Sequence, residues 1–153
     1  MLIGIIGESC SGKTTLAKEI QRAIAAEIVS GKDYLRMARS ESDAVMCFRE
    51  HLARAVNGDS LIYVITEPDQ CQLLPEGAMR ILVRADLDTI KARFRARMRG
   101  TLPPTVEQML ERKHGMFNDG SYDYVFRSET DDAAALCEIL TARQENAGER
   151  EAL

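Results

Sequence analysis

The sequence predicts an α/β fold in which a five-stranded parallel sheet lies between two layers of helices. Short apolar runs rich in β-branched residues, typical of buried parallel strands, recur along the 153 residues. Between these runs lie longer segments in which apolar residues return at helical spacing. Such alternation of strand and helix predicts right-handed crossovers, which place helices on both faces of the sheet.

The first 26 residues contain the pattern around which the rest of the chain is organised. Residues 2–6 read as a buried strand, and Leu16, Ile20 and Ile24 recur at helical spacing. Between them the chain fits the phosphate-loop pattern G-x-x-x-x-G-K-[ST] at every fixed position. Strand, loop and helix in this order predict a three-layer α/β/α P-loop NTPase fold. The loop with its following residue comprises Gly7, Glu8, Ser9, Cys10, Ser11, Gly12, Lys13, Thr14 and Thr15.

The fixed residues of this loop each have a chemical role. Gly7 and Gly12 allow backbone angles at which consecutive N–H groups converge on phosphate oxygens, and the following helix points its N-terminus at the same anion. Lys13 supplies a compact cation for the β- and γ-phosphates, and the Thr14 hydroxyl can ligate Mg²⁺. We therefore expect residues 7–15 to bind Mg·ATP, with Lys13 as a catalytic residue.

The same two patterns predict the other elements. Strands are expected at residues 26–30, 61–65, 80–83 and 122–126. Helices are expected at residues 32–38, 40–56, 86–98, 105–114 and 131–143. Three of these helices have a start signal. Ser40 with Asp43 marks the start of the helix at 40–56, Asp86 that of the helix at 86–98, and a capping box of Thr105 with Gln108 that of the helix at 105–114. We expect residues 1–143 to form a single domain and residues 144–153 to be a polar, frayed tail.

A basic stretch marks the candidate lid. Residues 91–99 hold five cations and no carboxylate, and Arg93 and Arg97 are four apart, which places them on one side of a helix. Residues 100–104 contain one Gly and two Pro and break that helix before the next one begins. Helix, break and helix predict a lid at about residues 93–112, in which Arg93 and Arg97 act as catalytic residues over the transferring phosphoryl group.

The remaining residues of the basic helix are expected to divide between core and solvent. The apolar stripe of Leu87, Ile90, Phe94 and Met98 is expected to face inward. Arg95 and Arg99 form a second pair that is expected to face solvent. A solvated basic face, without any lid, is the alternative interpretation of all four arginines.

Three acidic residues follow predicted strands, at the sheet edge where ligands bind in such folds. Asp33 is the candidate for orienting an acceptor or accepting its proton, and a plain helix cap is the alternative. Glu67 is the candidate that supports Mg²⁺ together with Thr14, and Asp69 could take the same role. A charged loop at the end of the strand is the alternative for both residues.

The chain resembles the nucleoside monophosphate kinase branch of the phosphate-loop kinases, with guanylate kinase closest in its second half. The resemblance rests on the R-x-x-x-R spacing of Arg93 and Arg97 and on the Tyr-Asp-Tyr-Val sequence at residues 122–125. It implies that Arg112, a basic residue on the next helix, binds the acceptor. The strand-rich nucleobase insertion of guanylate kinases has no counterpart, because residues 30–58 read as helical.

Residues 32–36 instead resemble the D-x-x-R acceptor-binding segment of shikimate, gluconate and adenylylsulfate kinases. This second resemblance implies that Asp33 and Arg36 hold a small acceptor. Together the two resemblances predict transfer of the γ-phosphoryl group of Mg·ATP to a small acceptor, a nucleotide in the first instance. The alternatives are a kinase for a small hydroxylated metabolite and a regulatory NTPase without any small-molecule acceptor.

Composition narrows the class of protein further. The formal charge of −4 argues against a general nucleic-acid binder, and no apolar run approaches the ~20 residues that span a bilayer. The start of the chain does not read as a signal peptide. The four cysteines of the chain are not spaced as metal ligands. We expect a cytoplasmic protein whose partner is a small-molecule acceptor, with the oligomeric state left open.

Overall fold

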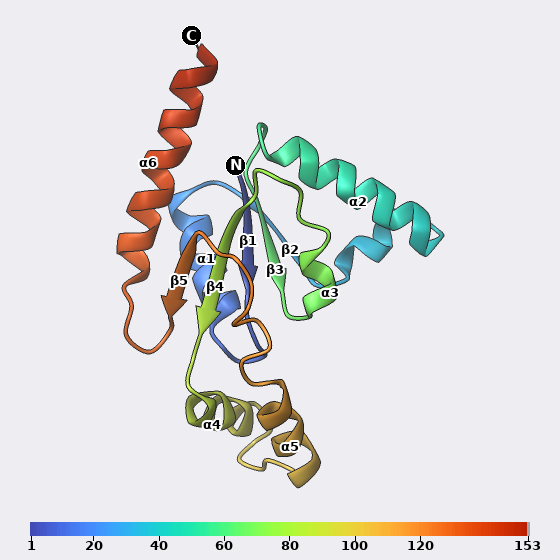
Figure 1. Cartoon of the computed structure of the whole chain (residues 1–153), viewed down its shortest axis with the longest axis vertical. Helices are drawn as coiled ribbons and strands as arrows, with labels where there is room; N and C mark the ends of the chain where they lie inside the picture. The colour runs from blue at the N-terminus through green and yellow to red at the C-terminus, as the bar shows by residue number, and fades with distance from the viewer. Residues whose placement is uncertain (153) are drawn as a thin grey trace.

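The five predicted strands form one parallel sheet in the computed structural model, which describes residues 1–152. The strand order is β2-β3-β1-β4-β5 (Figure 1). The strands are Leu2–Ile6 (β1), Glu27–Ser30 (β2), Leu61–Ile65 (β3), Met79–Arg84 (β4) and Tyr124–Arg127 (β5). The predicted α/β class with a five-stranded parallel sheet is thereby confirmed.

Helices flank this sheet and extend beyond one of its ends. They are Lys13–Ala23 (α1), Glu41–Ala55 (α2), Pro68–Cys71 (α3), Leu87–Arg97 (α4), Pro104–Lys113 (α5) and Ala133–Ala152 (α6), with a 3₁₀ helix at Asp33–Met37 (η1). In Figure 1, α1 and α6 lie on one side of the sheet and α2 on the other. The two lid helices, α4 and α5, lie below the carboxyl ends of the strands.

Two core clusters lie on opposite faces of the sheet, because alternate residues of a strand face opposite sides, and a third, smaller cluster contains Cys10, Ala85, Ile90 and Leu110. Ile3 and Ile5 of β1 pack with Leu16 of α1 on one side, and Leu2 and Ile6 pack against the α2 side. Every residue of β1 and β3 is buried, which explains why both strands are apolar throughout. The central position of β1 fixes the loop that follows it.

Two predicted details of the helix ends are wrong. The N-cap of α5 is Pro103, so Thr105 lies inside the first turn and forms no capping box with Gln108. A proline at the first helical position is itself a good start, because its missing N–H would have no partner there. Met98 ends α4 as its C-cap and is 39% exposed, although the apolar stripe predicted it to face inward.

Two further helical segments differ from the prediction. The closing helix α6 continues through residues 144–152, where a frayed tail was expected. One contact supports the extension, since the Gln144 side-chain amide donates to Ser60 Oγ at 2.8 Å. The short helix α3 was not predicted, and it begins at Pro68, in a segment that the sequence indicated as a charged loop.

Candidate active site

The phosphate loop leaves the end of β1 and enters α1, as predicted, and its backbone has the conformation that the motif requires. Gly12 has a φ of 109°, a left-handed angle that other residues avoid. A Cβ on Gly7 would lie 2.6 Å from the Val83 carbonyl oxygen and 2.7 Å from Ser11 Oγ, so only glycine fits. Within the part of the chain that the structure describes, buried Ser11 Oγ has no hydrogen-bond partner.

Lys13 is only 6% exposed and points back into its own loop. Its Nζ donates to the carbonyl oxygen of Glu8 at 2.7 Å, and an ammonium has two further donors. Burial lowers the pKa of Lys13 from 10.5 to about 8; nearby Arg97 also lowers it, whereas Cys10 and Glu8 raise it. The site thus combines the free N–H donors of Lys13, the left-handed Gly12 and the N-terminus of the 11-residue helix α1. This combination fits a polyphosphate.

Two clefts meet at the loop. The first, of about 400 Å³, is lined by Ser9, Cys10, Gly12, Lys13, Thr14, Thr15, Ser30, Gly31, Lys32, Asp33, Val64, Thr66 and Arg97. The second, of about 470 Å³, lies toward β5 and α6 and is lined by Cys10, Gly12, Thr15, Leu16, Glu19, Arg93, Ala96, Arg97, Phe126, Ser128, Asp131 and Ala133. The two clefts share Cys10, Gly12, Thr15 and Arg97, so they adjoin one another at the start of α1.

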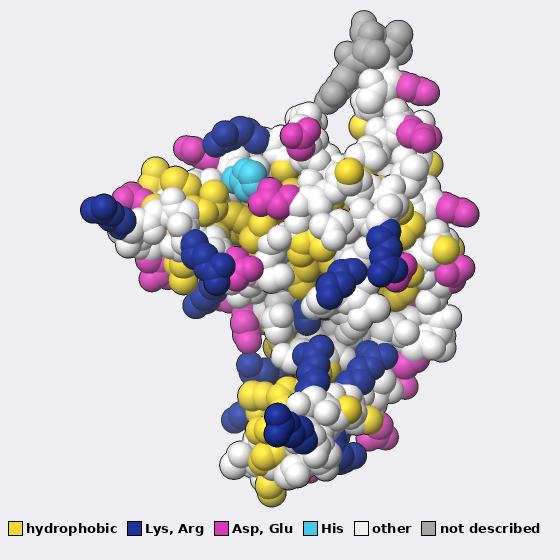
Figure 2. Space-filling model, turned by 180° about the vertical axis from the view of Figure 1, so that it is seen from behind, with side chains coloured by type: hydrophobic (Ala, Val, Ile, Leu, Met, Phe, Trp, Pro, Cys, Tyr) yellow, Lys and Arg dark blue, Asp and Glu magenta, His cyan; other side chains and the backbone are white. Residues whose placement is uncertain are grey.

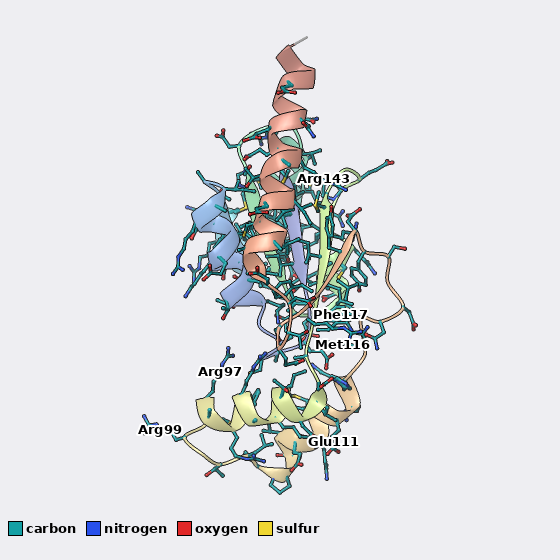
Figure 3. The ribbon with its side chains drawn as sticks, turned by 90° about the vertical axis from the view of Figure 1, so that its left-hand side faces the viewer. Arg97, Arg99, Glu111, Met116, Phe117 and Arg143 are labelled. Atoms are coloured by element: carbon teal, nitrogen blue, oxygen red, sulfur yellow. The ribbon has the colours of Figure 1, made fainter. Side chains whose placement is uncertain are left out.

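The structure brings both predicted lid arginines to the loop, but in different ways. Arg93 Nη1 donates to the Cys10 carbonyl oxygen at 3.1 Å and to Ser128 Oγ at 3.0 Å, which fixes α4 to the loop. Arg97 is exposed and lines both clefts, and within residues 1–149 it forms no ion pair. In Figure 3 the Arg97 side chain points toward the body of the molecule, whereas Arg99 points away from it.

Basic side chains gather where the lid meets the body of the molecule (Figure 2). Arg93 and Arg97 contribute from α4, and Arg97 lines the first cleft together with Lys13. Lys91 is different, because its Nζ binds Glu107 at 3.2 Å and Glu111 at 2.6 Å and so joins α4 to α5. The cations nearest the loop therefore remain available to a bound anion.

The two residues expected to support Mg²⁺ have different surroundings. Thr14 is exposed in the first cleft, whereas Glu67 forms an ion pair with Lys113 Nζ at 3.3 Å. The described residues include no group of three or more His, Cys, Asp or Glu side chains that could hold a metal ion. Magnesium usually binds through one or two protein groups together with substrate phosphates, so Thr14 fits it directly and Glu67 would share its charge with Lys113.

Lys113 is a residue that the sequence did not single out. The resemblance pointed to Arg112, but Arg112 is exposed and lines neither cleft at the loop. Its neighbour Lys113 is the residue that reaches the end of β3. Two adjacent cations near the end of a helix cannot be told apart by composition, because their directions depend on how the helix packs.

The predicted acceptor pair is only partly brought together. Asp33, the first residue of η1, lines the first cleft, whereas exposed Arg36 lies outside its lining. In a 3₁₀ helix, residues three apart lie on the same side, so Arg36 lies one turn farther along than Asp33. Tyr34 anchors this turn, because its ring stacks on Phe48 of α2 at a centroid distance of 4.9 Å.

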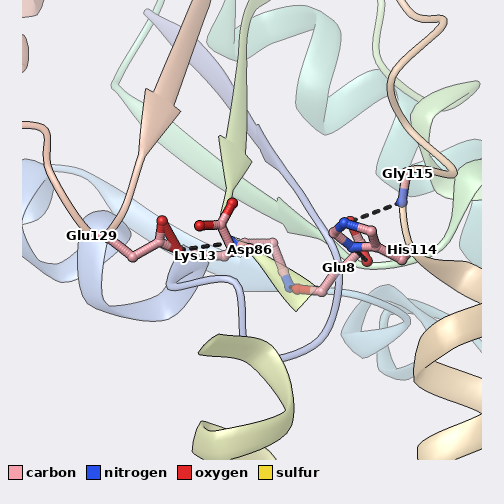
Figure 4. Close-up of polar contacts among 6 residues, drawn as sticks. All are labelled: Glu8, Lys13, Asp86, His114, Gly115 and Glu129. Atoms are coloured by element: carbon pink, nitrogen blue, oxygen red, sulfur yellow. Dashed lines mark hydrogen bonds and ion pairs between the residues drawn. The ribbon is translucent and has the colours of Figure 1, made fainter. Parts of the chain in front are cut away.

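Glu8 makes contacts that no sequence pattern indicated. His114 Nδ1 lies 3.0 Å from Glu8 Oε1, and the Gly115 N–H donates to Glu8 Oε2 at 3.2 Å (Figure 4). These contacts join the phosphate loop to the segment that follows α5. More than 100 residues separate the partners, so a local motif could not reveal them.

Solved structures with a similar fold include two shikimate kinases and a gluconokinase. The chain is similar to a shikimate kinase from Bacteroides thetaiotaomicron, with 15% identity, a TM-score of 0.58 and coverage of 95% of this chain and 98% of that one. It is also similar to a shikimate kinase from Acinetobacter baumannii in complex with shikimate, with 14% identity, a TM-score of 0.59 and coverage of 94% and 93%. A gluconokinase from Sinorhizobium meliloti 1021 matches with 14% identity, a TM-score of 0.55 and coverage of 93% and 96%.

At these identities the likeness concerns the fold alone. No protein-family model matches the chain, and no curated protein matches its sequence. The three-layer P-loop fold is confirmed by these neighbours, whereas the nucleoside monophosphate kinase branch stays a prediction. Among residues 1–152, no helix combines the length and the apolar composition needed to cross a bilayer.

Proposed function

We propose that this chain is an ATP-dependent kinase that transfers the γ-phosphoryl group to a small acceptor. One observation carries the proposal, namely that Lys13, Thr14, Asp33 and Arg97 line the same cleft of about 400 Å³. They come from three different elements and combine cations for a phosphate donor with a carboxylate for an acceptor. The shikimate kinases and the gluconokinase that share the fold support the same class of reaction.

The donor would occupy the two adjoining clefts. The loop N–H groups and Lys13 would bind its phosphates, and the second cleft, beside Arg93 and Phe126, would accept its base. Thr14, with Glu67 near it, would hold Mg²⁺, which neutralises charge on the phosphates when bound. The rest of the chemistry is positioning and charge stabilisation by the chain itself.

Asp33 and Arg97 would act on opposite ends of the transfer. Asp33 orients the attacking oxygen of the acceptor and, where that oxygen belongs to a hydroxyl group, accepts its proton as the new O–P bond forms. Arg97 stabilises the negative charge that develops as the bond from the γ-phosphorus to the bridging oxygen breaks and ADP leaves. Closure of α4 and α5 over the cleft would also keep water from reacting in place of the acceptor.

The acceptor class divides between two candidates. A nucleotide is supported by the Arg93–Arg97 spacing and by the Tyr-Asp-Tyr-Val sequence at residues 122–125. A small hydroxylated metabolite is supported by the segment between β2 and β3, where η1 and α2 are present without a strand. The shikimate and gluconate kinases with the same fold favour the metabolite about as strongly as the sequence favours the nucleotide.

The test is release of ADP from Mg·ATP against a panel of nucleoside monophosphates and hydroxylated acids and sugars. A kinase releases ADP in the presence of one acceptor class, and Asp33→Asn should then raise the acceptor KM or abolish transfer while Mg·ATP affinity stays near that of the parent. A regulatory NTPase would release ADP slowly and equally with every compound. That outcome would disprove the proposed function.

A further inference from the structure

Glu8 is an unexpected residue inside a loop that binds anions. Its side chain is 17% exposed, and its negative charge is close enough to raise the pKa of Lys13. A carboxylate near a phosphate site repels the phosphate, and the repulsion strengthens where water is excluded. Such a residue weakens nucleotide binding unless other groups hold its carboxylate by hydrogen bonds or an ion pair.

The partners of Glu8 lie on two sides of the residue. Its backbone carbonyl accepts a hydrogen bond from Lys13 Nζ at 2.7 Å. Its carboxylate binds His114 Nδ1 at 3.0 Å with one oxygen and the Gly115 N–H at 3.2 Å with the other. Figure 4 shows Glu8 between Lys13 on one side and the segment that leaves α5 on the other. One residue thus contacts both the phosphate-binding lysine and the end of the lid.

Buried apolar residues flank this end of the lid, namely Leu110 within α5 and Phe117 two residues beyond Gly115. Between them, Glu8 supplies the polar contacts to His114 and Gly115. Gly115 has a φ of 81°, a left-handed angle that turns the chain where Glu8 binds it. Lys113 comes immediately before these two anchored residues, and its Nζ lies 3.3 Å from Glu67 at the end of β3. We therefore expect the Glu8 contacts to contribute to the position of Lys113.

We propose that Glu8 is a positioning residue for phosphoryl transfer, which anchors His114 and Gly115 to the phosphate loop and so holds Lys113 beside the transfer site. This inference rests on the proposed kinase function. Glu8 acts through the residues that it holds and not on the reacting atoms. Its cost in phosphate repulsion is offset because its charge is engaged by an N–H donor and an imidazole.

The experiment compares Glu8→Ala, Glu8→Gln, His114→Ala and the double variant Glu8→Ala/His114→Ala. Glu107→Ala serves as the matched control, because that carboxylate contacts Lys91 within the lid. Misplacement of a group by about 1 Å can cost 10²-fold in rate, so we expect Glu8→Ala to lower kcat by about 10- to 100-fold. The Kd for Mg·ATP should change less than about threefold, and Glu8→Gln, which keeps an acceptor oxygen for Gly115, should recover most of kcat.

Two further results distinguish positioning from a general loss of structure. The double variant should be no slower than Glu8→Ala alone, because both changes break one unit, and the Gly115 amide should exchange with solvent faster in Glu8→Ala than in the control. An unchanged kcat, an equal loss of kcat and nucleotide affinity, or unchanged Gly115 exchange would overturn the proposal. If no acceptor supports transfer by the parent protein, the proposed function fails, and Gly115 exchange together with the rate of Mg·ATP hydrolysis decides the role of Glu8 instead.

Discussion

The phosphate loop and the lid bind to one another but are built in opposite ways. Ser11 and Lys13 are almost fully buried, and the loop is fixed between β1 and α1 at the centre of the sheet. The helices of the lid contain one buried residue each, Ile90 in α4 and Leu110 in α5. Few buried contacts mean low local stability, so we expect the loop to be the rigid half of the site and the lid to be the half that moves.

Two lysines show the same contrast in their titration. Burial lowers the pKa of Lys13 in the loop to about 8. In the lid, hydrogen bonding to Glu111 and Glu107 raises the pKa of Lys91 above its ordinary value. Burial thus destabilises the charged form of Lys13 in the loop, and a bound phosphate would stabilise it. The charge of Lys91 in the lid is already paired with two carboxylates.

The largest effect is expected from Lys13→Ala, which removes the buried cation of the phosphate loop. Loss of the charge-assisted bonds to phosphate should abolish measurable transfer and remove most of the stabilisation by Mg·ATP, while the fold persists. A thermal-shift titration with Mg·ATP measures this effect. A variant stabilised as much as the parent would show that the loop does not bind the donor through Lys13.

The next largest effect distinguishes two arginines of the lid, Arg97 and Arg99. Arg97→Ala should lower kcat and kcat/KM together by about 10²–10³, because its guanidinium lines the first cleft and acts as charge develops. Arg99→Ala is the control, since that side chain points away from the body of the molecule (Figure 3). Steady-state kinetics, with Mg·ATP affinity measured separately, test the pair. Equal and small effects would indicate a solvated basic face.

These two variants also mark how far the sequence could predict the site. The loop was predictable because Gly7, Gly12 and Lys13 act within one short segment, where backbone angles and helix direction follow from local sequence. Arg97 was predictable from four-residue spacing, which holds on any helix. Lys113 was not, because its direction depends on where α5 packs against the loop.

Long-range contacts account for the other errors. The Glu8 contacts join residues 106 and 107 positions apart, and the Gln144 contact that supports the end of α6 spans 84 positions. Periodicity and capping signals describe neighbours in sequence, so they can predict that a helix exists but not what its end will contact. Strands β1 and β3 were not subject to this limit, because they are buried along their whole length and are therefore apolar throughout.

A pH dependence should distinguish the buried cation from the exposed ones. Lys13 binds phosphate when protonated, so Mg·ATP affinity should fall as pH rises above about 8, approaching tenfold per unit, with proton uptake on binding. The free energy of unfolding should move the other way. Between pH 8 and 10.5 the unfolded chain binds the proton that native Lys13 has lost, so this residue makes stability rise with pH.

Titration calorimetry in buffers of different ionisation enthalpy measures the proton uptake, and denaturant unfolding measures the stability. Lys13→Ala is the control in both experiments and should flatten both profiles in this range. An affinity that stays constant from pH 7 to pH 9 in the parent protein would contradict burial of a titrating Lys13.

The smallest effect concerns Cys10, where loop and lid meet. Its φ of 62° is left-handed, which costs a residue other than glycine about 1 kcal/mol, yet its buried side chain packs with Ala85, Ile90 and Leu110 beneath the lid. Cys10→Gly relieves the backbone and loses the packing, so the free energy of unfolding should change by less than about 1 kcal/mol. Cys10→Ala keeps the strained Cβ and deletes the thiol, so it should be less stable than Cys10→Gly.

Denaturant unfolding compares the two variants, and amide exchange in α4 and α5 reports the lid, which should loosen in both. A Cys10→Gly protein less stable than Cys10→Ala would mean that the loop carries no backbone strain at this position and that Cys10 serves the lid alone.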